Sequence, residues 1–99
     1  MSYLEELADE IRSAVPRDVL PSEDTKDLFV LYAVLLLAKG EKVSGEDVHN
    51  AWVAWKITRG EHRDSMVPFA ELPLDTQAED APFVVAIRQI ARITNLGLR

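Results

Sequence analysis

The chain has 99 residues, of which 47% are hydrophobic and 28% charged, and its formal net charge is −6. This composition is that of an ordinary globular protein of single-domain size. The absence of cysteine excludes disulfides, thiolate metal sites and a cysteine nucleophile. Because the net negative charge repels phosphate backbones, we expect no nucleic-acid binding.

The sequence has no feature of a secreted or membrane protein. The N-terminal stretch MSYLEELADE is acidic and lacks the basic and apolar regions of a signal peptide. The longest apolar run, residues 28–38 (LFVLYAVLLLA), is shorter than the ~20 residues needed to cross a bilayer. We therefore expect a soluble, cytoplasmic protein with no membrane contact, and the lack of cysteine fits a reducing compartment.

Two helices are predicted in the first 40 residues. Ser2 and Glu5 have the spacing of a capping box, and apolar residues then recur at helical intervals until a proline ends the helix. Ser22, followed by two acidic residues, predicts the start of the second helix, and Gly40 predicts its left-handed C-terminus. Because residues 28–38 are apolar on every side, we expect this helix at the centre of the core.

The third helix has the clearest start in the chain. Ser44 is its expected N-cap, with Asp47 placed to complete a capping box, and Gly60 is expected to end it. Trp52 and Trp55 are three residues apart, so both indoles can lean into the same groove. Large aromatic side chains on one helix face favour a core position, although one indole N–H of such a pair is often directed at a partner or ligand.

Residues 61–82 contain three prolines and show no clean periodicity, which predicts a structured loop with at most a turn or two of helix. The fourth helix begins either at Thr76, which would form a capping box with Glu79, or at Asp80, which would cap a helix opening around Pro82. We interpret both acidic residues as helix caps rather than as a general acid or base.

The fourth helix is expected to end at Asn95 or Gly97. Together these patterns predict an all-α fold. It is expected to be a single domain spanning residues 1–99, with four main helices and a proline-rich irregular connection between the third and the fourth.

No pattern of catalytic or metal-binding residues is present, so we expect no enzyme, no catalytic residue, no metal and no cofactor. The two histidines lack metal-ligand spacing; we expect His49 to bond a carbonyl at the core edge and His62 to be solvated. Residues 39–55 also fit a helix-turn-helix DNA reader, although Glu46 and Asp47 would then meet the phosphates first.

Two segments carry a resemblance to a known family: VHNAWVAWKITRG (residues 48–60) and MVPFAEL (residues 66–72), followed by an aspartate two positions before Pro82. They resemble the repeat domain of ryanodine receptors, in which an (A/V)HNxW helix ends at a glycine and precedes an LVPY-like segment and a final helix. The similar portion spans about residues 44–97. EHRDS replaces the family's longer basic loop, and this shortened form is similar to small uncharacterised actinobacterial and actinophage proteins.

The resemblance implies a cytosolic, non-catalytic module, and we expect it to bind a protein partner. The alternative is a sensor for a nucleotide-derived or other small ligand, because prokaryotic relatives are suspected of sensing nucleotide-like molecules. A sensor should have a concave pocket with convergent polar groups, whereas a partner-binding domain should expose an apolar patch. The segment SMVPFAEL, residues 65–72, is interpreted first as a plug of the core and second as the rim of a site. The expected binding residues are His49, Trp52, Trp55, Arg63 and Phe69.

Overall fold

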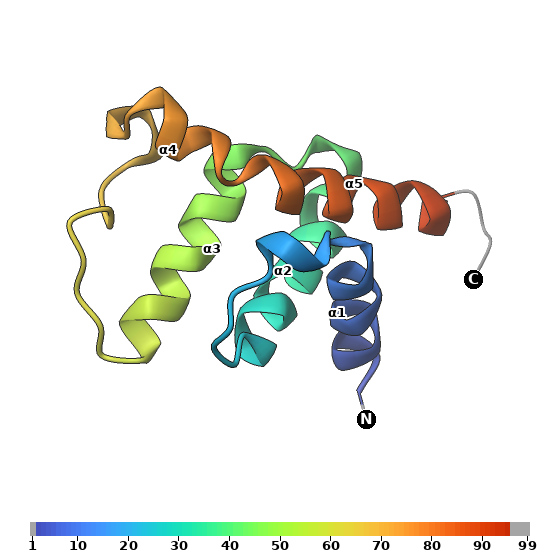
Figure 1. The fold of residues 1–99 in the computed structure, drawn as a ribbon. Helices are drawn as coiled ribbons and strands as arrows, with labels where there is room; N and C mark the ends of the chain where they lie inside the picture. Colours follow the sequence, from blue (N-terminus) through green and yellow to red (C-terminus); the bar gives the residue numbers. More distant parts are fainter. Residues whose placement is uncertain (1, 96–99) are drawn as a thin grey trace.

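The computed structural model describes residues 2–95, and they form an all-α fold, as predicted (Figure 1). Gly97, one of the two predicted ends of the last helix, lies outside these residues. The four long helices are α1 (Tyr3–Ala14), α2 (Lys26–Lys39), α3 (Gly45–Thr58) and α5 (Ala81–Asn95). A short helix, α4 (Leu74–Ala78), and three single 3₁₀ turns, η1 (Arg17–Val19), η2 (Gly40–Lys42) and η3 (Phe69–Glu71), lie between them.

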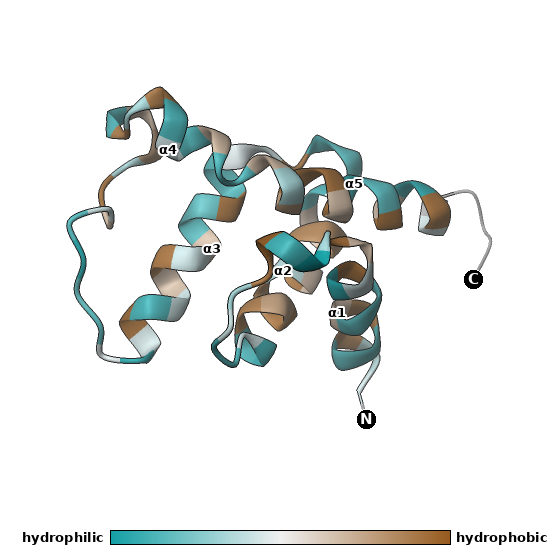
Figure 2. Cartoon of the chain, viewed as in Figure 1, coloured by the Kyte–Doolittle hydropathy of each residue, from teal (hydrophilic) through white to brown (hydrophobic). Residues whose placement is uncertain are grey.

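Helix α2 is the centre of the fold, because α1, α3 and α5 all pack against it. Figure 1 shows α5 running across α1 and α2, and Figure 2 shows hydrophobic residues along these helices where they meet. One face of α2 is nevertheless exposed to solvent, since Val34 is 46% and Leu37 is 56% exposed. The expected position of this helix at the centre of the core is confirmed, with one face left exposed. The buried residues of α2 are Leu28, Phe29, Tyr32, Ala33 and Leu36.

The two predicted capping boxes are confirmed. At the start of α1, the Glu5 amide donates to Ser2 Oγ at 3.2 Å and the Ser2 amide donates to Glu5 Oε1 at 3.1 Å. At the start of α3, the amides of Asp47 and Ser44 bond reciprocally to the other residue's side chain, at 3.4 and 2.9 Å. Gly40 ends α2 with φ +57° and ψ −127°, a conformation that glycine enters readily and other residues do not.

Helix α2 begins at Lys26, and its N-cap Thr25 lies three residues after Ser22, the N-cap that the sequence predicts. The cause is a contact from the far end of α3. Arg59 donates to the backbone carbonyl of Asp24 at 3.2 Å and forms an ion pair with Glu23 at 3.5 Å. These contacts hold the segment before α2 against the end of α3 in a non-helical conformation. The N-cap pattern is local, and it carries no information about a partner that lies 35 residues away.

Of the two predicted starts for the last helix, the one that follows Asp80 is confirmed, since α5 begins at Ala81. Thr76 lies inside α4, and its amide bonds to the carboxylate of Asp75 at 3.0 Å. The expected capping box of Thr76 with Glu79 is therefore wrong. The five residues of α4 are the short piece of helix that the sequence allows within residues 61–82, although helical periodicity over so few residues does not give its bounds.

Two arginines of α5, Arg88 and Arg92, bond to residues outside this helix. Arg88 Nε donates to the Val43 carbonyl at 2.8 Å, and Arg92 pairs with Glu41 at 3.1 Å. These contacts fasten α5 to η2 and the start of α3. No helix in the described part of the chain has the length and hydropathy to cross a membrane.

Residues 65–72 pack against α3, as expected for a plug. His49 Nε2 donates to the Val67 carbonyl at 2.6 Å, which confirms the expected bond of His49 to a carbonyl. The Phe69 ring lies 6.0 Å from the His49 ring and reaches Gly45, where an added Cβ would be 2.9 Å from the ring. Leu72 is buried, but Phe69 is only half-buried. Phe69 is therefore less deeply buried than a phenylalanine of the core.

Replacing Phe69 by Ala is expected to lower the free energy of unfolding by about 1–3 kcal/mol, less than the ~3–5 kcal/mol typical of a fully buried phenylalanine. The reason is that its ring, which packs on His49 and Gly45, is only half-buried and keeps part of its surface in water. Urea midpoints measure the change, with Leu74→Ala, at an 82% exposed position, as the control. Equal midpoints for the two variants would mean that the Phe69 ring does not hold residues 65–72 on α3.

Candidate functional site

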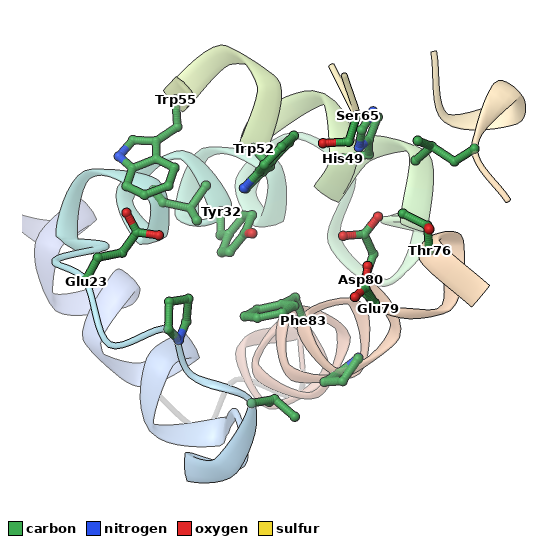
Figure 3. Close-up of a pocket in the computed structure, with 15 residues that line it drawn as sticks. Glu23, Tyr32, His49, Trp52, Trp55, Ser65, Thr76, Glu79, Asp80 and Phe83 are labelled. Carbon is green, nitrogen blue, oxygen red and sulfur yellow. The ribbon is translucent and has the colours of Figure 1, made fainter. Parts of the chain in front are cut away.

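A pocket of about 490 Å³ opens between α2, α3 and α5 (Figure 3). Its volume falls within the range of about 300–1,000 Å³ that is usual for small-molecule sites. The connection before α2 and residues 65–80 form the two sides of its rim. The residues that line it are Val19, Pro21, Glu23, Leu28, Tyr32, His49, Trp52, Trp55, Ser65, Leu72, Thr76, Glu79, Asp80, Pro82 and Phe83.

Aromatic rings make up much of the pocket wall. The rings of Tyr32 and Phe83 lie 5.8 Å apart, and Phe29 packs edge-on against Tyr32 at 5.1 Å from deeper in the core. On α3, His49 and Trp52 are stacked with their ring centroids 5.9 Å apart. Rings packed in this way are held in fixed orientations, so the pocket keeps its shape without a ligand.

Two cationic side chains, those of Lys56 and Arg59, lie over the ring of Trp55. Lys56 Nζ lies 4.7 Å and the Arg59 guanidinium 4.5 Å from the ring centroid, and Trp55 is only 3% exposed. The Lys56 ammonium, itself buried, pairs with Glu61 at 3.2 Å and with Glu23 at 3.8 Å. This ion cluster closes the end of the pocket where the segment before α2 meets the end of α3.

Arg63 belongs to the same ion cluster and not to the pocket. It is exposed and donates to Glu61 at 2.8 Å. Hydrogen bonds from Arg63 and then Lys56 lower the pKa of Glu61 to about 2. Because this pKa lies below that of the unfolded chain, the contribution of Glu61 to stability is present above about pH 4.5 and is lost as the pH falls toward 2.

Two polar groups face each other across the pocket. The Tyr32 hydroxyl points toward the Asp80 carboxylate (Figure 3), and neither side chain forms a hydrogen bond with any residue of the described range 2–95. Burial, with a smaller effect of the Asp80 charge, raises the pKa of Tyr32 far above its usual range, so its hydroxyl stays a donor. Burial raises the pKa of Asp80 to about 6; His49 opposes this shift and Glu79 adds to it.

Sequence reasoning missed these groups. Asp80 and Glu79 were interpreted as helix caps, but within residues 2–95 neither carboxylate bonds to a backbone amide. The proline at position 82 supplies the reason: it removes the N–H at the second position of α5, and the Phe83 amide bonds to the backbone carbonyl of Asp80 at 3.1 Å. The pattern Asp-x-Pro was the available signal. Tyr32 gave none, because a core helix does not reveal which of its residues borders a cavity.

Of the five predicted binding residues, three come together in the pocket wall, namely His49, Trp52 and Trp55. Phe69 and Arg63 do not line it. Phe69 packs on His49 and Gly45 of α3, and Arg63 belongs to the ion cluster through Glu61. The spacing on α3 therefore predicts one wall of the pocket, whereas the two loop residues lie outside the pocket lining.

Replacing Asp80 by Asn is expected to stabilise the protein by about 1–2 kcal/mol near neutral pH, a figure discounted because the group is only half-buried. Because its pKa is raised above the unfolded value of 3.8, the ionised carboxylate destabilises the fold, and the penalty grows as the pH rises from about 4 through 6. Thermal melts at about pH 7 and 4 should show a gain that disappears in acid. Asp64→Asn, at an exposed loop position, is the control of equal charge. A loss of stability in Asp80→Asn at neutral pH would mean that the carboxylate has an internal partner.

Within residues 2–95, no three side chains of the metal-ligating types come together in a way that could hold a metal ion. The sequence matches, over residues 2–92, a family described as "Domain of unknown function (DUF7701)". No curated protein and no solved structure matches the chain.

Proposed function

The chain belongs to the DUF7701 family, and we propose that it is a non-catalytic domain that binds a small molecule in the pocket between α2, α3 and α5. The observation that supports this most is the facing pair of Tyr32 hydroxyl and Asp80 carboxylate, which border a pocket of about 490 Å³ without a partner in residues 2–95. Neither group is sealed from solvent, because no fully buried side-chain nitrogen or oxygen in residues 2–95 lacks a hydrogen-bond partner, so both can bond to a molecule in the pocket. A pair directed into a cavity is placed to bind a ligand.

A small ligand is favoured over the protein partner that the sequence led us to expect. A partner-binding domain exposes a contiguous apolar patch, whereas a ligand site is concave with a few convergent polar groups. Here the exposed apolar side chains are spread over several helices, with Val34 and Leu37 on α2, Ile57 on α3 and Val85 on α5. The protein-partner function remains the second candidate, and the adjacent Val34 and Leu37 are the residues it would use.

The pocket favours binding over catalysis. His49 Nε2 is used by its bond to the Val67 carbonyl at 2.6 Å, and within the described residues Ser65 forms no hydrogen bond with a base. Nucleophilic catalysis needs a hydroxyl or thiol within hydrogen-bond reach of a base. The pocket therefore supports recognition of a molecule, as in a sensor or accessory domain.

The residues that line the pocket disfavour a ligand that carries phosphate. The sequence allowed a nucleotide-derived or another small ligand, and we therefore propose a small ligand that is not a nucleotide. Three carboxylates line the pocket, those of Glu23, Glu79 and Asp80, and no lysine or arginine does. Phosphate sites use basic side chains or backbone N–H groups. The resemblance to ryanodine-receptor repeats, the cytoplasmic location and the lack of nucleic-acid binding stay predictions, and this proposal does not depend on them.

A thermal-shift screen tests the proposed function, using a library that contains cationic, neutral and anionic small molecules. A ligand at about 100 times its dissociation constant adds about 2.7 kcal/mol to stability. Hits should shift the wild type and Ile57→Ala, a variant of the exposed face of α3, but not Trp52→Ala, which removes one pocket wall. Equal shifts in Trp52→Ala, or no hit of any charge, would contradict the proposal.

A further inference from the structure

Near neutral pH the Asp80 carboxylate is negatively charged, and no ion pair within residues 2–95 neutralises it. It precedes α5 at the N-cap position but does not cap it, and in residues 2–95 no lysine or arginine pairs with it. Glu79, beside it, also lines the pocket and has no ion-pair partner in this range. Glu23, on the opposite rim, is already paired with Lys56 and Arg59. The excess negative charge of the pocket therefore lies at Asp80 and Glu79.

The Tyr32 hydroxyl lies on the other side of the same space. Tyr32 is 2% exposed as a residue, and its hydroxyl has no hydrogen-bond partner among the described residues. The hydroxyl oxygen is open to the pocket, because no fully buried side-chain nitrogen or oxygen in residues 2–95 lacks a partner. In Figure 3 it points toward Asp80, and the indole nitrogen of Trp52 also points into the space between the walls. A ligand group bound here meets a carboxylate on one side and a phenolic oxygen on the other.

The aromatic rings of the pocket wall also favour positive charge in the cavity. The rings of Tyr32, Trp52 and Phe83 border the cavity, and the faces of such rings attract cations within about 6 Å of the ring centroid. The fold already uses this interaction behind the pocket, where Lys56 and Arg59 lie over Trp55. Flat apolar molecules can stack between the same walls.

On these observations we propose that the ligand is an organic cation: a flat, mainly apolar molecule that carries a protonated amine or amidine, with its charge at Asp80 and its ring between Trp52 and Phe83. This inference rests on the proposed small-molecule function and specifies the class of ligand. A net charge of −6 acts in the same direction, because it raises the local concentration of cations and lowers that of anions.

The inference is tested with three probes that share an indole ring and differ in charge: tryptamine, indole-3-ethanol and indole-3-propionate. Affinities are measured by NMR or calorimetric titration of the wild-type protein at about pH 7. Tryptamine should bind at least about tenfold more tightly than the alcohol, and the carboxylate should bind most weakly. If the alcohol or the carboxylate binds as well as tryptamine, the cation class is wrong while the small-molecule function stands. If none of the three binds, the inference also fails, and the outcome of the wider library screen decides the proposed function separately.

Two isosteric variants locate the charge. Asp80→Asn should lower the affinity for tryptamine roughly 10- to 100-fold and leave that for indole-3-ethanol almost unchanged. Asp64→Asn changes the net charge equally at an exposed position outside the pocket and should leave both affinities as they are. Thermal melts confirm that each variant is folded. An equal effect of the two substitutions would show that only the overall charge attracts the cation, and no effect of either would remove Asp80 from the site.

Discussion

Replacing Leu36 by Ala is expected to lower the free energy of unfolding by about 2–5 kcal/mol, a large share of the ~5–15 kcal/mol that stabilises a typical domain. Leu36 is 4% exposed and lies on the face of α2 that meets the core. Its removal leaves a cavity at the junction of α2 with its neighbours, and rigid helices close such a space only in part. Urea unfolding followed by circular dichroism measures the loss.

Leu37, the next residue along α2, provides the matched control. It is 56% exposed, so Leu37→Ala should change the free energy of unfolding by no more than about 0.5 kcal/mol. Leu35 is half-buried, and its variant should lie between the two. If Leu37→Ala costs as much as Leu36→Ala, the exposed face of α2 is covered in solution, which would point to a partner or a second copy of the chain.

Trp55→Ala is expected to be the other severe change, with a cost of about 3–5 kcal/mol. The indole is 3% exposed, and Lys56 and Arg59 lie over its ring, so the substitution removes a core side chain together with two cation–π contacts. The same change enlarges the pocket at the end that the ion cluster closes. Stability and ligand affinity should therefore both fall.

The control for Trp55 is Ile57→Ala on the same helix. Ile57 is 63% exposed and alanine favours helix, so its variant should unfold at nearly the same urea concentration as the wild type. Trp52→Ala should cost less than Trp55→Ala, because Trp52 is half-buried, but should affect ligand binding more. A Trp55→Ala variant as stable as Ile57→Ala would contradict the role of Trp55 as a structural wall.

The parts of the fold that could be predicted from the sequence are those that depend on local chemistry. A capping box such as Ser44 with Asp47 involves residues three positions apart, and a glycine such as Gly40 acts through its own backbone angles. The late start of α2 could not be predicted in this way. It depends on the contact of Arg59 with Asp24, which exists only once the end of α3 has packed beside that segment.

The same distinction between local chemistry and tertiary packing applies to the residues of the pocket. Helical spacing places His49, Trp52 and Trp55 near one another on α3, so one wall of the pocket could be predicted. Which core residue of α2 borders the opposite wall depends on how three helices pack, and Tyr32 therefore looked like any other core residue. Asp80 resembles a helix cap in the sequence because the cap pattern does not register the missing N–H of Pro82.

The central claim, that the pocket between α2, α3 and α5 binds a small cationic ligand, is tested most directly by NMR chemical shifts during a tryptamine titration. We expect saturable shifts of the Trp52 indole N–H and of the amides of Asp80 and Phe83, with the amides of Val34 and Leu37 unchanged. The Trp52 indole signal is identified with a Trp52→Phe variant. Shifts confined to Val34 and Leu37, or shifts that grow without saturation over the whole chain, would contradict the claim.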